Sequence, residues 1–455
     1  MSVGKLPEGW VETQLDEILL LIVGGGTPSK ANPEYYQGEI PWMSVKDMNK
    51  HTLTDTMDHI TPEAVKNSST NIIPAGTPII ATRMSLGKIV TASFDSAINQ
   101  DLKALFLSSG TDRNFFLHWY RSQAQLIESL GTGTTVKGIR LEVLKALTIF
   151  LPPLAEQKII AEKLDTLLAQ VDSTKARLEK IPQILKRFRQ AVLAAATSGF
   201  LTNELTSREL PYNWRVVKLI DVIKNKPRNG YSPKGVDYVT DIKNLTLSAI
   251  TKGFFLGEHF KYVDIDISHD SHLWLKNEDF LIQRANSLEY VGISALYEGE
   301  DNKFIYPDLM MKFRANEKII PKYLEYSLHS EKMRKYFRNN ATGTAGNMPK
   351  INQTTVSEAP VNLPPLPEQH EIVRRVEQLF AYADTIEKQV NAALARVNNL
   401  TQSILAKAFR GELTAHWRAE NPALISGENS AAALLEKIKA ERAASTGKKA
   451  SRKKA

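Results

Sequence analysis

Several loops of this chain combine glycine with hydroxyl, amide and basic side chains, a mixture that suits contact with nucleic acid. The segment Gly24–Lys30 reads GGGTPSK. Its glycines allow the backbone to approach a ligand closely, and Ser29 and Lys30 can donate hydrogen bonds to phosphate oxygens. Asn99 and Gln100 form a further polar cluster with the aspartate that follows them. These residue types predict contacts with DNA.

A second kind of loop carries a basic residue beside a turn. Thr82–Lys88 reads TRMSLGK, and its expected counterpart in the second half of the chain, Gln283–Ser287, reads QRANS. Arginine and lysine can bond two acceptors on guanine, whereas asparagine and glutamine can do the same on adenine. Arg284 and Asn286 are therefore candidates for reading bases.

Two further loops, Thr132–Arg140 and Thr342–Lys350, both begin with TGT. Their glycines and hydroxyls suit a loop that contacts phosphate, although a solvated turn is an equally good interpretation of any one of these loops. The residues that we predict to contact DNA are Ser29, Lys30, Arg83, Ser85, Lys88, Asn99, Gln100, Thr132, Thr134, Thr135, Lys137, Arg140, Lys226, Arg228, Asn229, Ser232, Lys234, Gln283, Arg284, Asn286, Ser287, Thr342, Thr344, Asn347 and Lys350.

No motif for catalysis or metal binding accompanies these loops. The sequence contains no GxxxxGK[ST] phosphate loop, and Gly131–Gly138 resembles one only superficially. Asn32–Tyr35 (NPEY) approaches the Asn-Pro-Pro-aromatic motif of adenine methyltransferases, but Glu34 replaces the second proline. The nine histidines show no clear metal-binding spacing, and cysteine is absent. We predict no catalytic, cofactor or metal site in this chain.

The size and composition are those of a multidomain globular protein. A length of 455 residues predicts two to three domains, and the hydrophobic fraction of 42% is ordinary for such chains. No run approaches the ~18 apolar residues that cross a membrane. The start, MSVGKLPEGW, lacks the apolar core of a signal peptide. With no cysteine, these features indicate a cytoplasmic protein without membrane contact.

The positive charge is concentrated at the end of the chain. Of the net charge of +8, about +5 belongs to the residues from Ala415 onward. By contrast, residues 11–150 carry about −2 and residues 215–360 about +3. Basicity alone is therefore weak support for nucleic-acid binding, and DNA-binding segments of this kind would need partner subunits to supply much of the attraction to phosphate.

One long segment of the sequence occurs twice. Leu151–Thr202 reappears as Leu363–Thr414 at a constant offset of 212 residues, and 17 of the 52 aligned positions are identical. Each copy begins LPPL-x-EQ, and the stretches between the copies are unlike each other. The short segments LPEGW at Leu6–Trp10 and LPYNW at Leu210–Trp214 also correspond. A repeated frame therefore holds two different recognition segments.

Both copies carry apolar residues at alternating spacings of four and three, which is typical of a coiled coil. We expect the two helices to pack on each other and, if they are related by a two-fold axis, to run antiparallel; the alternative is that each packs on its own neighbouring domain. Pro182, opposite Leu394, is expected to kink the first helix. The predicted seam comprises Leu167, Val171, Thr174, Leu178, Ile181, Leu185, Phe188 and Val192, with Leu379, Ala383, Ile386, Val390, Ala393, Val397, Leu400 and Ile404 in the second copy.

The two variable segments are predicted to have mixed α/β structure. They contain short apolar runs separated by turn residues, and amphipathic stretches at Arg113–Leu130 and Lys318–Phe337.

The chain resembles the specificity (S) subunits of type I restriction–modification enzymes, in particular the enterobacterial group. The resemblance is carried by the twin LPPL-x-EQ helices, the paired TGT loops, the LPEGW segment and the tail from Phe409. The resemblance implies two α/β (α+β) target-recognition domains, each followed by a long helix, with the two helices in an antiparallel coiled coil.

The domain boundaries that we expect are 1–150 for the first recognition domain, 151–202 for the first repeat helix and 203–362 for the second recognition domain. The second repeat helix then covers 363–414, and a C-terminal segment with a basic tail covers 415–455. The resemblance implies a non-catalytic subunit of a host-defence restriction system, whose two domains read the halves of an asymmetric, bipartite sequence in double-stranded DNA.

The resemblance also implies partners. Two methyltransferase (M) subunits would use S-adenosylmethionine to methylate adenine, and restriction/translocase (R) subunits would use ATP and Mg. Two alternatives stay open at this point. One is a self-contained DNA methyltransferase or nuclease with a fused recognition domain, and the other is an adaptor that contacts only proteins.

Overall fold

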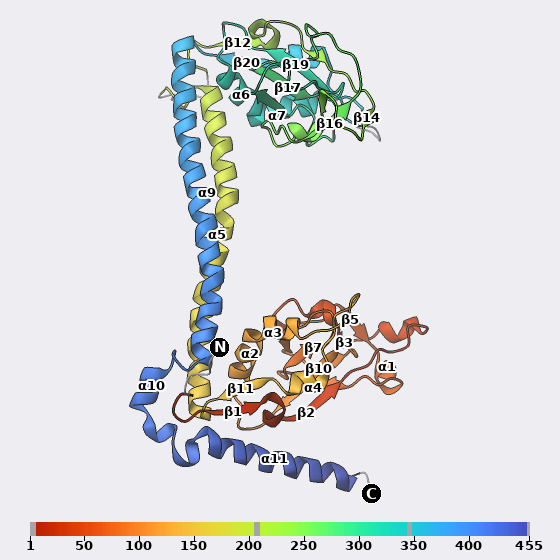
Figure 1. Ribbon diagram of the computed structural model, residues 1–455, viewed down its shortest axis with the longest axis vertical. Helices are drawn as coiled ribbons and strands as arrows, with labels where there is room; N and C mark the ends of the chain where they lie inside the picture. Colours follow the sequence, from red (N-terminus) through yellow and green to blue (C-terminus); the bar gives the residue numbers. More distant parts are fainter. Residues whose placement is uncertain (1–5, 204–209, 344–347, 453–455) are drawn as a thin grey trace. The chain divides into compact units, whose positions relative to one another are not determined.

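The computed structural model describes residues 6–203, 210–343 and 348–452, and the side chains as far as residue 444. The chain forms two compact units (Figure 1). Unit 1 contains Met1–Leu178 and Ala393–Ala455, and unit 2 contains Glu179–Ala392. Each unit therefore combines one recognition segment with parts of both repeat helices.

Unit 1 is built on two sheets. The five-stranded sheet has the order β2 (Leu19–Gly24), β10 (Leu102–Leu107), β7 (Ile79–Ala81), β8 (Ile89–Ala92) and β4 (Thr52–Leu53). The four-stranded sheet has the order β5 (Asp58–Ile60), β3 (Ile40–Met43), β9 (Ser96–Ile98) and β6 (Ile72–Ile73). A separate ribbon pairs β1 (Val11–Gln14) with β11 (Thr148–Leu151). The short helices are α1 (Pro62–Lys66), α2 (Arg113–Ser122), α3 (Ala124–Ser129) and α4 (Leu141–Lys145).

The five-stranded sheet is covered on both faces, which explains why its central strand β7 is apolar and buried at every position. Ile80 belongs to a core with α2, whereas its neighbours Ile79 and Ala81 belong to a second core on the opposite face. Neighbouring residues belong to different cores because successive side chains of a strand point to opposite faces of the sheet. Helix α2 begins where the Asp112 carboxylate accepts a hydrogen bond from the Phe115 N–H (2.9 Å).

Unit 2 repeats this plan with a different sequence. A four-stranded sheet has the order β13 (Arg228–Asn229), β19 (Met310–Arg314), β17 (Asp279–Gln283) and β18 (Ser294–Tyr297). A three-stranded sheet has the order β14 (Gly235–Val236), β16 (Phe260–Val263) and β15 (Ile242–Leu245), and β12 (Arg215–Lys218) pairs with β20 (Pro360–Leu363). The short helices are α6 (Pro321–His329), α7 (Glu331–Asn339) and α8 (Gln353–Ser357). The order β13-β19-β17-β18 corresponds to β2-β10-β7-β8 in unit 1.

The two repeat segments form long helices, α5 (Leu154–Ser198) and α9 (Leu366–Phe409). In unit 1, Leu164 near the start of α5 shares a core with Leu405 and Ala408 near the end of α9. In unit 2, Val192 near the end of α5 shares a core with Ile372 near the start of α9. The helices therefore run antiparallel and pack together, as the repeated heptads predict. Each helix also packs on its own domain, so the two expected modes of packing occur together.

The seam differs from the predicted one at two positions. Thr174 is exposed, and the Leu400 side chain is 48% exposed. The apolar stripe shifts by one residue here because a straight α-helix has 3.6 rather than 3.5 residues per turn. Helix α5 continues through Pro182, which lies on its exposed side, so the proline ends neither the helix nor the seam.

The glutamine of each LPPL-x-EQ motif joins a helix to the backbone of its domain. The Gln157 side-chain oxygen accepts a hydrogen bond from the Asp112 N–H (2.8 Å), and its amide donates to the carbonyls of Gly110 (3.1 Å) and Pro152 (3.0 Å). Its counterpart Gln369 accepts from the Ile320 N–H (2.8 Å) and donates to Lys318 (3.0 Å) and Pro364 (2.9 Å). Because only backbone groups of the domain are used, the contact tolerates almost any recognition sequence.

The glutamate of each motif joins the start of one helix to the end of the other repeat. In unit 1, the fully buried Glu156 carboxylate accepts hydrogen bonds from Trp10 Nε1 (2.8 Å), Thr414 Oγ1 (2.6 Å) and Arg418 Nη1 (2.5 Å). In unit 2, the Glu368 carboxylate accepts from Thr202 Oγ1 (2.8 Å) and from Asn203 Nδ2 (2.7 Å). Thr202 and Thr414 end the two repeats, so each repeat closes on the other.

The C-terminal segment folds onto unit 1 as α10 (Ala415–Glu420) and α11 (Ala431–Arg452). Glu441 accepts hydrogen bonds from the Ser109 N–H (3.0 Å) and Oγ (2.9 Å). Ile438 lies against Gly110, where a Cβ would come within 2.8 Å of the isoleucine side chain. Gly110 and Lys318 offer equivalent carbonyls to Gln157 and Gln369, so a lysine stands in unit 2 at the position that a glycine holds in unit 1.

We expect Gln157→Ala to lower the free energy of unfolding of unit 1 by about 2–4 kcal/mol, because one buried N–H and two carbonyls lose their partner. Denaturant titration and the hydrogen-exchange rate of the Asp112 amide measure the effect. Gln170→Ala, at an exposed position of the same helix, should change the stability by less than about 0.5 kcal/mol. Equal losses in the two variants would contradict the role given to Gln157.

We expect Gly110→Lys to release α11 from unit 1, because the added side chain would occupy the space of Ile438 and Leu434. Limited proteolysis should then cleave the chain after Lys437 and Lys439, while the sheets of unit 1 keep their protection against hydrogen exchange. Asn114→Lys, which adds the same charge at an exposed position of unit 1, is the control. Unchanged protection of α11 in Gly110→Lys would show that this close approach does not select the docking position.

Candidate nucleic-acid interface

In unit 1, the loop between β7 and β8 pairs with the first TGT loop. The Met84 N–H donates to the carbonyl of Lys137 (2.9 Å), and the Ile139 N–H donates to the carbonyl of Thr82 (3.0 Å). Thr132 and Gly138 exchange two hydrogen bonds of 2.8 Å, which closes the TGT loop as a hairpin. The two loops form one polar surface at the end of the sheet.

The same constellation occurs in unit 2 with different residues. The Asn286 N–H donates to the carbonyl of Pro349 (3.3 Å), and the Ile351 N–H donates to the carbonyl of Arg284 (2.9 Å). Thr342 and Lys350 exchange two hydrogen bonds of 2.9 Å. The loops Thr82–Lys88 and Gln283–Ser287 are thus structural counterparts, as the sequence predicts.

The two loops correspond to each other, but their arginines do not occupy equivalent positions. The hydrogen-bond pattern aligns Arg284 with Thr82 and aligns Asn286 with Met84. Arg83 instead corresponds to Ala285, since both form the isolated bridges to the TGT hairpins. The two arginines therefore project from different positions of the same frame.

Most of the predicted DNA-contacting residues are accessible. The exposed residues are Ser29, Lys30, Arg83, Lys88, Gln100, Thr132, Thr134, Thr135, Lys137, Arg140, Lys226, Arg228, Ser232, Lys234, Ser287, Thr342 and Lys350. Ser85, Asn229, Arg284 and Asn286 are half-buried, and Asn99 and Gln283 are buried. Thr344 and Asn347 lie outside the described residues.

The position of Gln283 is at odds with the prediction that it contacts DNA. Its side chain is fully buried, and its amide donates to the carbonyl of Leu247 (3.0 Å) and to Thr251 Oγ1 (2.9 Å). Its side-chain oxygen accepts a hydrogen bond from Asn286 Nδ2 (2.7 Å). The residue ends β17 inside the core, so it fixes the orientation of Asn286 and does not face a ligand.

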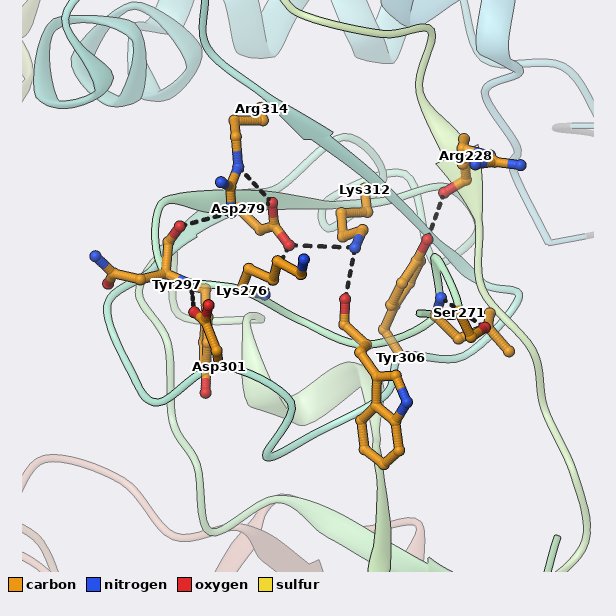
Figure 2. Close-up of polar contacts among 12 residues, drawn as sticks. Arg228, Ser271, Lys276, Asp279, Tyr297, Asp301, Tyr306, Lys312 and Arg314 are labelled. Atoms are coloured by element: carbon orange, nitrogen blue, oxygen red, sulfur yellow. Dashed lines mark hydrogen bonds and ion pairs between the residues drawn. The ribbon is translucent and has the colours of Figure 1, made fainter. Parts of the chain in front are cut away.

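A buried ion cluster holds the strands that carry the second group of predicted contacts (Figure 2). The Asp279 carboxylate, only 4% exposed, accepts from Arg314 Nε (3.0 Å), and Lys312 Nζ lies 3.2 Å from it. Lys312 also donates to the carbonyl of Trp274 (2.6 Å). Burial lowers the pKa of Lys312, whereas the nearby Asp279 carboxylate acts in the opposite direction.

Lys312 Nζ lies over the Tyr306 ring, 5.6 Å from its centre, and so connects the cluster to the edge strand β13. The Tyr306 hydroxyl donates to the carbonyl of Arg228 (3.2 Å), as Figure 2 shows, and Arg228 lies opposite Lys312 in the β13–β19 register. Burial raises the pKa of Tyr306, so its hydroxyl stays a neutral donor. The cluster is thus a support for the exposed side chain of Arg228 and not a catalytic group.

Sequence reasoning missed two kinds of residue at these loops. Arg334 of α7 donates to the carbonyls of Val291 and Glu289 (both 2.9 Å) and so anchors the loop that carries Arg284. Val136 and Met348, which precede the equivalent residues Lys137 and Pro349, are apolar and 38% and 48% exposed. The amphipathic pattern of α7 does not indicate that Arg334 holds a loop. The exposure of Val136 and Met348 depends on the geometry of the TGT hairpins, which the sequence does not reveal.

The described parts of the chain contain no group of three or more histidine, aspartate or glutamate side chains arranged to hold a metal ion. Among the helices in the described ranges, none combines the length and the apolar character needed to cross a membrane.

Comparison with known proteins identifies the family. Residues 7–183 and 211–396 match the family model of the type I restriction modification DNA specificity domain. The chain belongs to this family. The specificity subunits of the EcoKI enzyme of Escherichia coli K12 and of the StySPI enzyme of Salmonella potsdam are each 43% identical to it, with full coverage of both chains. The EcoDI specificity subunit of Escherichia coli is 40% identical, also over the full length.

Solved structures share the fold of this family. A chain solved in work on complex assembly and conformational transition of the type I R-M system matches with a TM-score of 0.68 and 19% identity, covering 90% of this chain and 100% of that chain. The HsdS subunit from Thermoanaerobacter tengcongensis matches with a TM-score of 0.59 and 20% identity, covering 90% and 99% of the two chains.

Family membership decides between the interpretations that the sequence left open. The full-length relatives are specificity subunits, and the paired recognition domains with packed long helices fit that assignment. This chain is accordingly a non-catalytic DNA-specificity subunit, rather than a self-contained methyltransferase or nuclease.

Proposed function

We propose that the two units read the two halves of an asymmetric, bipartite DNA sequence, each through its pair of loops. The equivalence of the two loop pairs carries this proposal, because one backbone frame presents different side chains in each unit. Unlike side chains on a common frame favour unlike bases, so the half-sites should differ. The candidate contacts are the exposed and half-buried residues at these loops and along β13.

The charge of the units supports a division of labour with partners. The recognition segments are almost neutral, so direct contacts specify bases while partner subunits supply much of the attraction to phosphate. We propose that two methyltransferase subunits bind this chain and carry S-adenosylmethionine, and that restriction subunits supply ATP- and Mg-dependent translocation and cleavage in the cytoplasm. The proposed domains are 1–150 and 203–362 for recognition, 151–202 and 363–414 for the helices, and 415–455 for the tail.

Reconstitution tests the proposed function. The purified chain alone should transfer no methyl group to DNA, and the chain with its methyltransferase subunits should methylate adenine within one bipartite sequence. Replacing residues 11–150 with the equivalent segment of a relative should change one half of that sequence and leave the other half unchanged. Methylation by the chain alone, or a target that does not respond to the exchange, would refute the proposal.

We expect Arg284→Ala to relax the specificity at one position of one half-site, at a cost of about 1–3 kcal/mol in discrimination. Arg284 makes one long internal hydrogen bond, from Nη1 to the carbonyl of Asp308 (3.5 Å), so other guanidinium donors can face DNA. Methylation rates on duplexes with single base changes measure the effect. Lys252→Ala removes an exposed charge of the same unit as a control, and a uniform loss over all sequences in Arg284→Ala would instead mark a phosphate contact.

A further inference from the structure

An open cavity of about 690 Å³ lies in unit 1, beside the loops that we propose to contact DNA. Met84 of the β7–β8 loop and Lys30 of the glycine-rich loop contribute to its wall. Asn99, Gln100 and Asp101, which follow β9, contribute polar groups. Its size lies in the range of pockets that hold small organic ligands.

Two amides in this wall have unused donors. The Asn99 side-chain oxygen accepts a hydrogen bond from the Asp101 N–H (3.1 Å), and the Gln100 side-chain oxygen accepts one from Thr27 Oγ1. Within the described residues, the NH2 groups of these two amides donate to no protein acceptor. They can therefore donate to a ligand.

The same wall holds an acceptor whose hydrogen-bonding capacity is unused. Asp101 is 5% exposed, and its Oδ1 atom is buried without a hydrogen bond among the described residues. Arg83 Nη1 lies 3.5 Å from that oxygen, an ion pair that offsets part of the cost of burying the carboxylate. Because Oδ1 has almost no accessible surface, a ligand in the cavity would donate to the second oxygen, Oδ2, which accepts no hydrogen bond among the described residues. A mostly buried carboxylate without donors is costly, so such a ligand would be bound selectively.

Two aromatic rings also line the cavity. Tyr36 and Trp42 pack edge to face with their ring centres 5.8 Å apart. The Tyr36 hydroxyl donates to the carbonyl of Pro28 (2.7 Å) and the Trp42 Nε1 donates to the carbonyl of Gly26 (3.1 Å). Because their polar atoms are occupied by the glycine-rich loop, the rings present an apolar surface to the cavity.

We propose that this cavity receives a nucleobase displaced from the half-site read by unit 1, and that the exocyclic amino group of the base donates to Asp101. The proposal rests on the proposed function and extends it. An aspartate accepts from the amino group of cytosine, and adenine carries an equivalent donor. Pockets that combine apolar walls with hydrogen bonds to the base edge are those that hold displaced bases.

Abasic duplexes test whether a base leaves the helix. The specificity subunit is assembled with its methyltransferase subunits, and one base at a time is removed from either strand of the half-site read by unit 1, leaving out the adenine that is methylated. If a base occupies the cavity, removing its pairing partner should tighten binding about tenfold, since less unpairing is needed, and removing the base itself should weaken binding. Weaker or unchanged binding for both strands at every position would overturn the proposal.

Asp101→Asn tests the assignment of the cavity, because it replaces an acceptor with an amide of the same shape. We expect a loss of preference of about tenfold at the displaced position only, with the half-site of unit 2 still read normally as a sign of intact folding. Asp55→Asn, an exposed carboxylate of unit 1 outside the cavity, should leave the preference unchanged. A preference at that position that is unaltered in Asp101→Asn would overturn the assignment.

Free deoxyadenosine and deoxycytidine monophosphates distinguish a displaced base from a soluble nucleotide. Titration of the complex should show no saturable binding below about millimolar concentration, because a free nucleotide lacks the duplex contacts that present the base. Tight, Asp101-dependent binding of either nucleotide would overturn the DNA source. A complex without sequence-specific methylation would refute the proposed function itself, which separates the two failures.

Discussion

The buried glutamate and glutamine of the LPPL-x-EQ motif are the constraint on which the rest of the structure depends. Glu156 brings together Trp10, 146 positions before it, and Arg418, 262 positions after it, so it closes unit 1 around residues far apart in the sequence. Gln157 then attaches the helix to the backbone of the recognition domain. Burying a carboxylate is favourable only where its lone pairs are satisfied, and three donors around Glu156 meet that condition.

The frame could be predicted from the sequence because its signals are repeated. The duplicated helices, their antiparallel packing and the mixed α/β domains all follow from apolar periodicity and from two copies of one motif. The exact residues of the seam could not be predicted in this way, because the difference between 3.5 and 3.6 residues per turn displaces positions such as Thr174 and Leu400 from the buried stripe. The partners of Glu156 were also hidden, since no local pattern connects it to Thr414.

The candidate DNA interface was predictable as a set of loops but not as individual side chains. Glycine, hydroxyl and basic residues identified the loops, whereas the alignment of Arg284 with Thr82 depends on hydrogen bonds between segments far apart in sequence. Glutamine is a residue type that can read bases, but Gln283 is the last residue of β17, and its side chain therefore lies in the core. Asp101, a carboxylate among basic loops, gained a role only through the cavity that it lines.

Helix α11 makes unit 1 different from unit 2. The equivalent glutamine junctions would offer a partner two matching places, but α11 covers the neighbourhood of Gly110 in unit 1, and a lysine, Lys318, stands at the equivalent position in unit 2. A protein that bound through the shared junction geometry would associate in two copies per subunit. One that needed the surface of α11 would associate in a single copy, so the stoichiometry of an assembly reveals which of the two surfaces it uses.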